Sequence, residues 1–261
     1  MSGARVYVIT DLEGVAGVQR WEETREEGPK KERAMRLLTA EVNAAVDGIL
    51  DADPHAQVVV WDGHGSGGID IERFHPKARI IPRGPIGPPY FMDEGFDALF
   101  FVGQHAMAGT SNAPLSHTYS SRTVEYYKLN GIPMGEFGCR AALAGSLGIP
   151  TVFVSGDDRA VAEARELVPD IFGAVVKEGR GIEMAVHLSP PLARQLIRET
   201  ASAATGHIED VSPFVLTPPY EQEIRFLRNV DLSAYTRRPG LERIDERTFV
   251  VRSDVLSELM V

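Results

Sequence analysis

The stretch VYVITDLEG, residues 6–14, decides the fold, because five strand-forming residues run directly into an acidic, glycine-containing segment. A strand that is apolar nearly throughout is typical of a sheet covered by helices on both faces. The same form recurs along the chain, in QVVVWDGHG (57–65), ALFFVGQHA (98–106) and TVFVSGDD (151–158), with a fifth plausible strand in GAVV (173–176).

Helical patterns separate these strands. Residues 30–52 place Leu38, Val42, Ala45 and Ile49 on one stripe, as an amphipathic helix does. Two more helices are expected at 135–147, where Gly148 and Pro150 provide a stop signal, and at 159–167. Strands that alternate with helices indicate an α/β fold with a mostly parallel sheet flanked by helices. The Pro- and Gly-rich segment 69–97 is expected to run over the surface.

The rhythm changes after about residue 185. A helix is expected at 190–205, and the segments 221–227 and 247–252 have the pattern of strands in a mixed or antiparallel pair. We therefore predict two domains, a larger α/β domain at 1–185 and a smaller C-terminal α+β subdomain at 186–261.

Composition excludes several classes of function. Lys and Arg number 27 against 37 Asp and Glu, so the net charge is −10 among 261 residues. An acidic chain argues against nucleic acid as the partner, because phosphate binding needs clustered basic side chains. A single cysteine, Cys139, allows no intrachain disulfide, and neither a secretory signal pattern nor a membrane-length apolar run is present. We expect a cytoplasmic protein that does not associate with membranes.

Metal-competent side chains follow three successive predicted strands. Asp11 and Glu13 follow the first strand, Asp62 and His64 the second, and His105 the third. Ligands of open α/β sheets bind outside the carboxyl ends of the strands. In an extended segment, residues two apart point to the same face. The side chains are therefore expected to converge at one edge of the sheet.

Together with Glu136, the set has three carboxylates and two imidazoles, which are ligands expected for zinc and its neighbours. A single catalytic zinc uses three protein ligands and a water, so this set is too large for one ion. It suits two metals about 3.5–4 Å apart that are bridged by a carboxylate, for which Asp11 is the best candidate.

Six segments, taken in order, resemble the motif series of the zinc D-aminopeptidase family associated with bacterial dipeptide-transport operons. They are DLEGVAG (11–17), DGHGSG (62–67), GQHAMAG (103–109), LSHT (115–118), GEFG (135–138) and SGDDRA (155–160), and the resemblance covers roughly residues 6–190. It implies that two zinc ions are bound by Asp11, Glu13, His64, His105 and Glu136, and that His117 is catalytic. It also implies cleavage of N-terminal D-amino acids from short peptides such as D-alanyl dipeptides, within a ring-shaped homo-oligomer, possibly a decamer.

The chemistry of such a site is consistent with peptide hydrolysis. A metal lowers the pKa of a bound water to near 7 and polarises the scissile carbonyl. The family resemblance describes His117 as a nucleophile. We favour a role in proton transfer to the departing amine, because a metal-bound hydroxide already supplies the nucleophile.

Other interpretations stay open. A two-metal phosphoesterase, or another metal-dependent amidohydrolase, uses a similar site. A phosphoesterase needs basic residues beside the metals, but the candidates Arg122, Arg140 and Arg159 lie outside the metal motifs. A non-enzymatic metal-storage or assembly protein needs no surplus histidine such as His117. Asp62 either binds the metal, orients His64 or shapes a turn.

Overall fold

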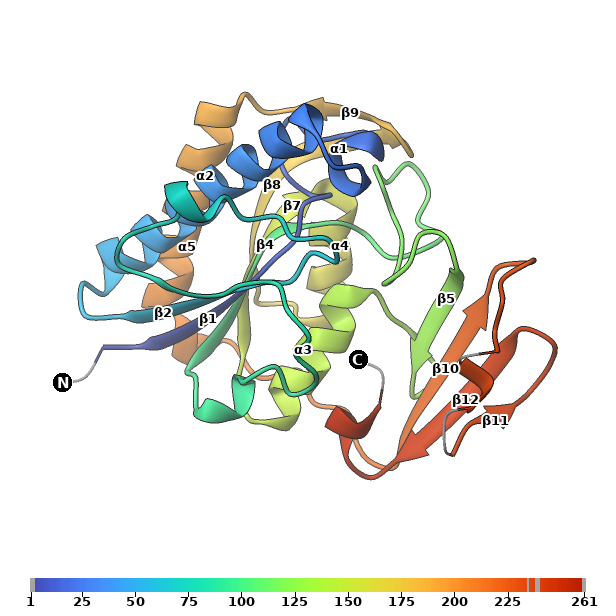
Figure 1. The fold of residues 1–261 in the computed structure, drawn as a ribbon. Coiled ribbons are helices and arrows are strands. Elements are labelled where there is room, and N and C mark those ends of the chain that lie inside the picture. Colours follow the sequence, from blue (N-terminus) through green and yellow to red (C-terminus); the bar gives the residue numbers. More distant parts are fainter. Residues whose placement is uncertain (1–2, 234, 238–239, 260–261) are drawn as a thin grey trace.

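A twisted, mostly parallel sheet forms the centre of the protein, whose computed structural model describes residues 3–233, 235–237 and 240–259. Within these residues the sheet has seven strands in the order β3-β2-β1-β4-β7-β8-β9 (Figure 1). All neighbouring strands are parallel except β8 and β9. The bounds are β1 Arg5–Thr10, β2 Gln57–Asp62, β3 Arg79–Ile81, β4 Ala98–Gln104, β7 Thr151–Asp157, β8 Phe172–Gly181 and β9 Met184–His187.

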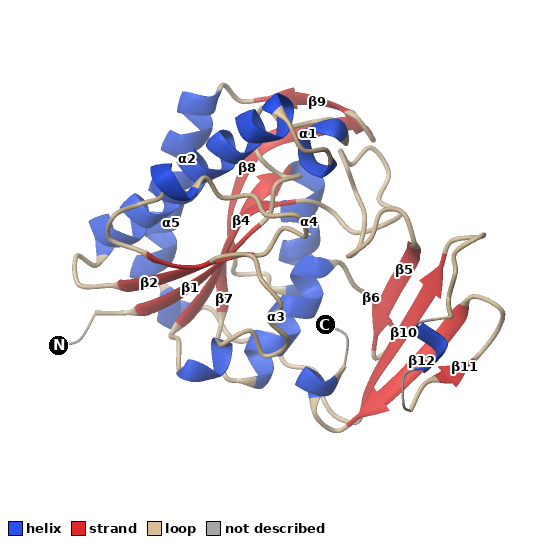
Figure 2. Cartoon of the chain, in the orientation of Figure 1, coloured by secondary structure: helices blue, strands red, loops and turns tan. Residues whose placement is uncertain are grey.

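Two pairs of helices flank this sheet (Figure 2). Helix α2, Pro29–Ala52, packs against α5, Pro190–Gly206, while α3, Glu136–Ser146, contacts α4, Asp158–Leu167. The stripe predicted for α2 is buried, and Pro29 occupies its first turn, where proline costs no hydrogen bond. The remaining helical segments are short: α1 Glu22–Arg25 and the 3-10 turns Ile71–Arg73, Met92–Glu94, Ile208–Asp210, Tyr235–Arg237 and Leu256–Glu258.

A second, antiparallel sheet lies beside the first (Figure 1). Its order is β11-β12-β10-β5-β6, and its bounds are β5 Val124–Leu129, β6 Ile132–Pro133, β10 Tyr220–Phe226, β11 Glu242–Arg243 and β12 Thr248–Ser253. This sheet draws β5 and β6 from the middle of the chain, whereas β9 and α5 belong with the first sheet. The two sheets are thus not divided at residue 185, and the two-domain division stays a prediction.

The predicted α/β class is confirmed, as are all five parallel strands, the four long helices and the two late strands. The sequence pattern did not predict β3, β9 or β5, for a different reason in each case. β3 has three residues and lies at a sheet edge, β9 is an exposed antiparallel edge strand, and β5 reads VEYYKL, with too few apolar residues to mark a buried strand.

The strand order places a topological switch point between β1 and β4. From β1 the chain proceeds to β2 on one side, whereas β4, β7 and β8 extend the sheet on the other. Loops leaving the carboxyl ends of two such strands diverge, which opens a crevice where ligands bind in α/β proteins. Asp11 follows β1 and His105 follows β4, so both stand at this crevice.

Among the described residues, the helices are all too short or too polar to cross a membrane.

Candidate metal centre

The side chains predicted from the first three strand ends do converge. His105 Nε2 lies 3.0 Å from Asp11 Oδ2, and His64 Nε2 lies 3.4 Å from Glu13 Oε1. All four residues are buried, with exposed fractions of 9% or less. The loops that carry them are joined through their backbones, since Asp11 N donates to Val102 O over 2.9 Å.

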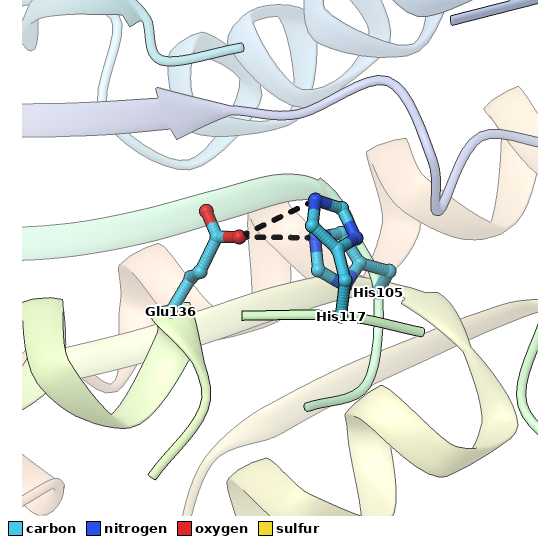
Figure 3. A group of neighbouring side chains, drawn as sticks. All are labelled: His105, His117 and Glu136. Carbon is cyan, nitrogen blue, oxygen red and sulfur yellow. Dashed lines mark ion pairs between the residues drawn. The ribbon is translucent and has the colours of Figure 1, made fainter. Parts of the chain in front are cut away.

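Glu136 and His117 complete the cluster from outside the strand ends (Figure 3). Glu136 is the first residue of α3, and its Oε1 lies 3.5 Å from His105 Nε2 and 3.6 Å from His117 Nε2. The same carboxylate accepts a hydrogen bond from Tyr119 N over 2.7 Å, which fixes the loop that carries His117. The rings of His105 and His117 stack with centroids 4.0 Å apart. All six predicted site residues therefore lie together.

Glycines allow the strand ends to approach this closely. A Cβ at Gly14 would lie 2.1 Å from the carbonyl oxygen of Gln104, and a Cβ at Gly156 would lie 1.9 Å from it. The carbonyl before His105 is thus held between the loop after β1 and the strand β7. Backbone contact, with no side chain between the segments, sets the position of His105.

The orientation of the three imidazoles prepares them to bind a cation. Nδ1 of His105 lies 2.9 Å from Ala106 O, Nδ1 of His117 lies 2.9 Å from Leu115 O, and Nδ1 of His64 lies 3.3 Å from Gly67 O. A carbonyl only accepts, so in each ring Nδ1 carries the proton and Nε2 keeps its lone pair in the neutral form. Each Nε2 faces a carboxylate of the cluster. Metal-binding histidines are oriented in this way.

Several buried polar atoms of the cluster make no hydrogen bond to any part of the chain that the structure describes. They are Asp11 Oδ2, Glu13 Oε2 and His105 Nε2, of which Asp11 Oδ2 and His105 Nε2 face each other over 3.0 Å as an ion pair without forming a hydrogen bond. Buried polar atoms without a partner are rare and costly, and each needs an explanation. Nitrogen and carboxylate oxygen are the donors that zinc accepts. The donor set therefore fits a metal ion.

The ligand atoms form two overlapping groups. Those of Asp11, Glu13 and His105 all lie within 4.8 Å of one another, and so do those of His105, His117 and Glu136. The second group includes His117, to which the sequence assigned a catalytic role outside the ligand set. The geometry thus permits His117 to act as a ligand as well as a proton carrier.

Without a cation, protonated imidazoles balance the carboxylates. Burial disfavours charge on His64, yet the Glu13 carboxylate raises the pKa of His64 to about 9. For His105, burial is likewise outweighed by Asp11, and its pKa lies well above the usual value. Burial and the nearby Glu13 raise the pKa of Asp11 to about 6. By contrast, burial and the charge of His105 lower the pKa of His117. His117 is therefore the neutral imidazole of the site.

Behind the site, a buried lysine supports the loop after β1. Lys177, at 1% exposure, donates through Nζ to the carbonyl oxygens of Glu13 and, over 2.7 Å, of Val18. Glu41 of α2 accepts a hydrogen bond from Ala16 N over 2.9 Å. Sequence reasoning missed both residues, because a single lysine after an apolar run and a single glutamate in a helix are ordinary surface patterns.

The cluster opens into a polar cavity of about 290 Å³. Besides the predicted residues, Arg25, Tyr119, Ser121 and Arg122 line it. Of the arginines considered for a phosphoesterase, Arg122 thus lies at the site. Arg140 lies 4.2 Å from the ring centroid of Tyr90 and lines a small neighbouring cavity with Asp11 and Glu136, whereas Arg159 lies 3.6 Å from Asp158.

Three further residues with reactive side chains have structural roles or are unreactive. Asp62 accepts hydrogen bonds from Gly68 N over 2.9 Å and from Ile69 N over 3.3 Å, so it shapes the turn that carries His64. Asp157 caps α4. Burial raises the pKa of Cys139 to about 12, which makes it a poor nucleophile.

Fold and site together define a class of protein, the α/β metallohydrolases that hold their ions at the carboxyl edge of a sheet with carboxylate and imidazole ligands. Comparison with known proteins narrows the class. A family model for D-aminopeptidases matches residues 4–261, and the chain belongs to this D-aminopeptidase family.

Two relatives illustrate the similarity. A D-aminopeptidase of Bacillus subtilis (strain 168) is 33% identical over 222 residues, which are 82% of this chain and 78% of the relative. A solved structure, "Zn-dependent D-aminopeptidase DppA from Bacillus subtilis, a self-compartmentalizing protease", superimposes with a TM-score of 0.89 at 27% identity. That match covers 97% of this chain and 93% of the other. The family expected from the sequence motifs is confirmed, and the matched region extends beyond residue 190.

Proposed function

We propose that this D-aminopeptidase binds two zinc ions per chain and removes D-alanine-type residues from the N-terminus of short peptides. The observation that carries the proposal is the orientation of the imidazoles, whose Nε2 atoms face the carboxylates while Nδ1 faces backbone carbonyls. The zinc dependence of the similar Bacillus subtilis enzyme supports the choice of metal. The proposed ligands are Asp11, Glu13, His64, His105 and Glu136.

The chain's own residues supply the rest of the chemistry. Zinc, when bound, contributes Lewis acidity toward the scissile carbonyl and toward water. His117 is neutral at neutral pH, lines the cavity and keeps the lone pair of Nε2 beside Glu136, so it can accept a proton from water. It can then return this proton to the amine that leaves. The cavity is at the small end of the range for ligand sites, which favours short peptides.

The assembly is inferred from the relative. The Bacillus subtilis structure is called self-compartmentalizing, and we infer that this chain also forms a closed homo-oligomer, with a ring of ten as one possible size. We propose a cytoplasmic location on the sequence pattern alone. Native mass spectrometry of the purified protein would give the number of chains, and a monomer at micromolar concentration would contradict the inference.

The central test combines metal analysis with substrate choice. We expect two zinc ions per chain, hydrolysis of D-Ala-D-Ala and much slower hydrolysis of L-Ala-L-Ala. Turnover of p-nitrophenyl phosphate, with none of D-Ala-D-Ala, would overturn the proposal in favour of a phosphoesterase.

The role of His117 has a separate test. His117→Ala is expected to lose 10²–10⁴-fold in kcat, the usual contribution of a general acid or base, while two metals per chain remain. Loss of one metal in this variant would instead make His117 a ligand.

A further inference from the structure

Two arginines stand in the wall of the cavity beside the proposed metal ligands. Arg25 is the last residue of α1, and Arg122 precedes β5, so they reach the cavity from distant parts of the chain. Arg25 Nη2 contacts Ser121 Oγ, and its guanidinium lies 3.4 Å from the ring centroid of Trp21. These contacts hold the guanidinium of Arg25 in place over the cavity.

Neither arginine forms an ion pair with a carboxylate among residues 3–233, 235–237 and 240–259. Other arginines of the chain do, as Arg247 does with Glu125 over 2.6 Å. Burial and the charge of Arg122 lower the pKa of Arg25, so the two cations lie close enough to repel each other. The charge of Glu13 also acts on Arg25, which places it within electrostatic reach of the metal ligands. A bound anion would relieve the repulsion.

The proposed function indicates which anion. When the scissile carbonyl of a dipeptide lies at the metals, its C-terminal carboxylate lies one residue farther along the chain, roughly 3.3–3.6 Å for an extended peptide. Guanidinium groups bind carboxylates through paired, charge-assisted hydrogen bonds. In a longer peptide this position holds an amide, which carries no charge.

We propose that Arg25 and Arg122 bind the free C-terminal carboxylate of the substrate and thereby make the enzyme selective for dipeptides. This inference rests on the proposed aminopeptidase function. According to this proposal, residues outside the metal centre determine which peptide length the enzyme prefers.

The test compares two substrates that differ only in this charge, D-Ala-D-Ala and its C-terminal amide, with the zinc-loaded enzyme. Water cleaves the first peptide bond in both, and the products are D-Ala and either D-Ala or D-alaninamide. We expect kcat/KM for the dipeptide to exceed that for the amide at least tenfold, mainly through KM. In Arg122→Gln and Arg25→Gln, this ratio should fall about tenfold while kcat/KM for the amide changes little. One charged pair at about 1.4 kcal/mol gives a factor of this size.

Arg36→Gln is the matched control, since Arg36 is an exposed arginine of α2 that pairs with Glu32 at 3.9 Å and does not line the cavity. It should leave both rates unchanged. Equal turnover of dipeptide and amide by the wild-type enzyme would refute the inference and leave the aminopeptidase function intact. Equal losses on both substrates in the two variants would refute it as well. Failure to hydrolyse either substrate would remove the proposed function and the inference with it.

Discussion

Replacing Gly156 by alanine tests whether backbone contact sets the position of His105. The new Cβ would lie 1.9 Å from Gln104 O, and Cβ atoms essentially never approach closer than 3.0 Å, so β4 and β7 must separate by about 1.1 Å. The contact is with backbone, which cannot rotate away as a side chain does. His105 is the next residue after Gln104 and must move with it.

The size of the effect follows from this movement. Overpacking of a buried site typically costs about 1–3 kcal/mol, and a misplacement of about 1 Å at a catalytic site can cost on the order of 10²-fold in rate. We therefore expect Gly156→Ala to remain folded, with a lower midpoint in urea, and to lose roughly 10²-fold in kcat/KM on D-Ala-D-Ala. Zinc should also bind more weakly, as measured by competition with a chelator.

The matched control is Gly206→Ala at the end of α5, where a Cβ would meet nothing within 4 Å and the backbone needs no positive φ. It should behave as the wild type. If Gly156→Ala kept full zinc affinity and activity, the strand ends would be free to adjust, and the proposed control of the site by backbone contact would be wrong.

Three further predictions concern pH and charge. Burial and the charge of Lys177 lower the pKa of His187 to about 4, below its value of about 6.5 in an unfolded chain, so the neutral form stabilises the fold. This contribution to stability is complete above pH 6.5 and is lost as the pH falls toward 4. Allowing for solvent screening, we expect the free energy of unfolding in urea to fall by roughly 1–2 kcal/mol over this range. The His187→Asn variant should not show this fall. Lys177→Met removes the donor to the carbonyl of Glu13 and leaves buried carboxylates without a compensating charge. It should therefore lower the free energy of unfolding by about 3–5 kcal/mol and weaken zinc binding. An unchanged unfolding midpoint would show that the lysine is dispensable. Because His64 and His105 are protonated at pH 7 without metal, zinc binding should release about two protons per chain. Calorimetry in buffers of different ionisation enthalpy measures this release. The absence of proton release would contradict the raised pKa values.

The convergence of the proposed metal ligands was predictable from the sequence for a simple reason. Asp11, His64 and His105 each follow an apolar run long enough to identify a buried strand, and parallel strands bring their carboxyl ends to one edge. Glu136 and His117 carry no such signal and were assigned from the motif resemblance. Their roles, like those of the other site residues, stay predictions, although the structure brings all six side chains together.

The strand order and the cavity wall could not be predicted in the same way. Nothing in the strand patterns says that β1 pairs with β4, and this pairing creates the crevice. Arg25 lies in WEETREE, a charged stretch typical of an exposed helix, and its contact Ser121 is 96 residues away in sequence. Tertiary contacts over such separations leave no local pattern, so the place of Arg25 in the cavity wall became visible only in the folded chain.

Asp11, His64 and His105, which are proposed metal ligands, and Arg122, which is one of the two proposed recognition residues, are attached to different sheets. Asp11, His64 and His105 are attached to strands of the central sheet, whereas Arg122 precedes β5 and belongs to the approach to the antiparallel sheet. Mutations in that approach could retune which peptides are accepted while the hydrolytic machinery stays intact. An enzyme built in this way can change its substrate specificity through one short segment. Directed evolution aimed at new substrates should therefore begin at residues 120–123.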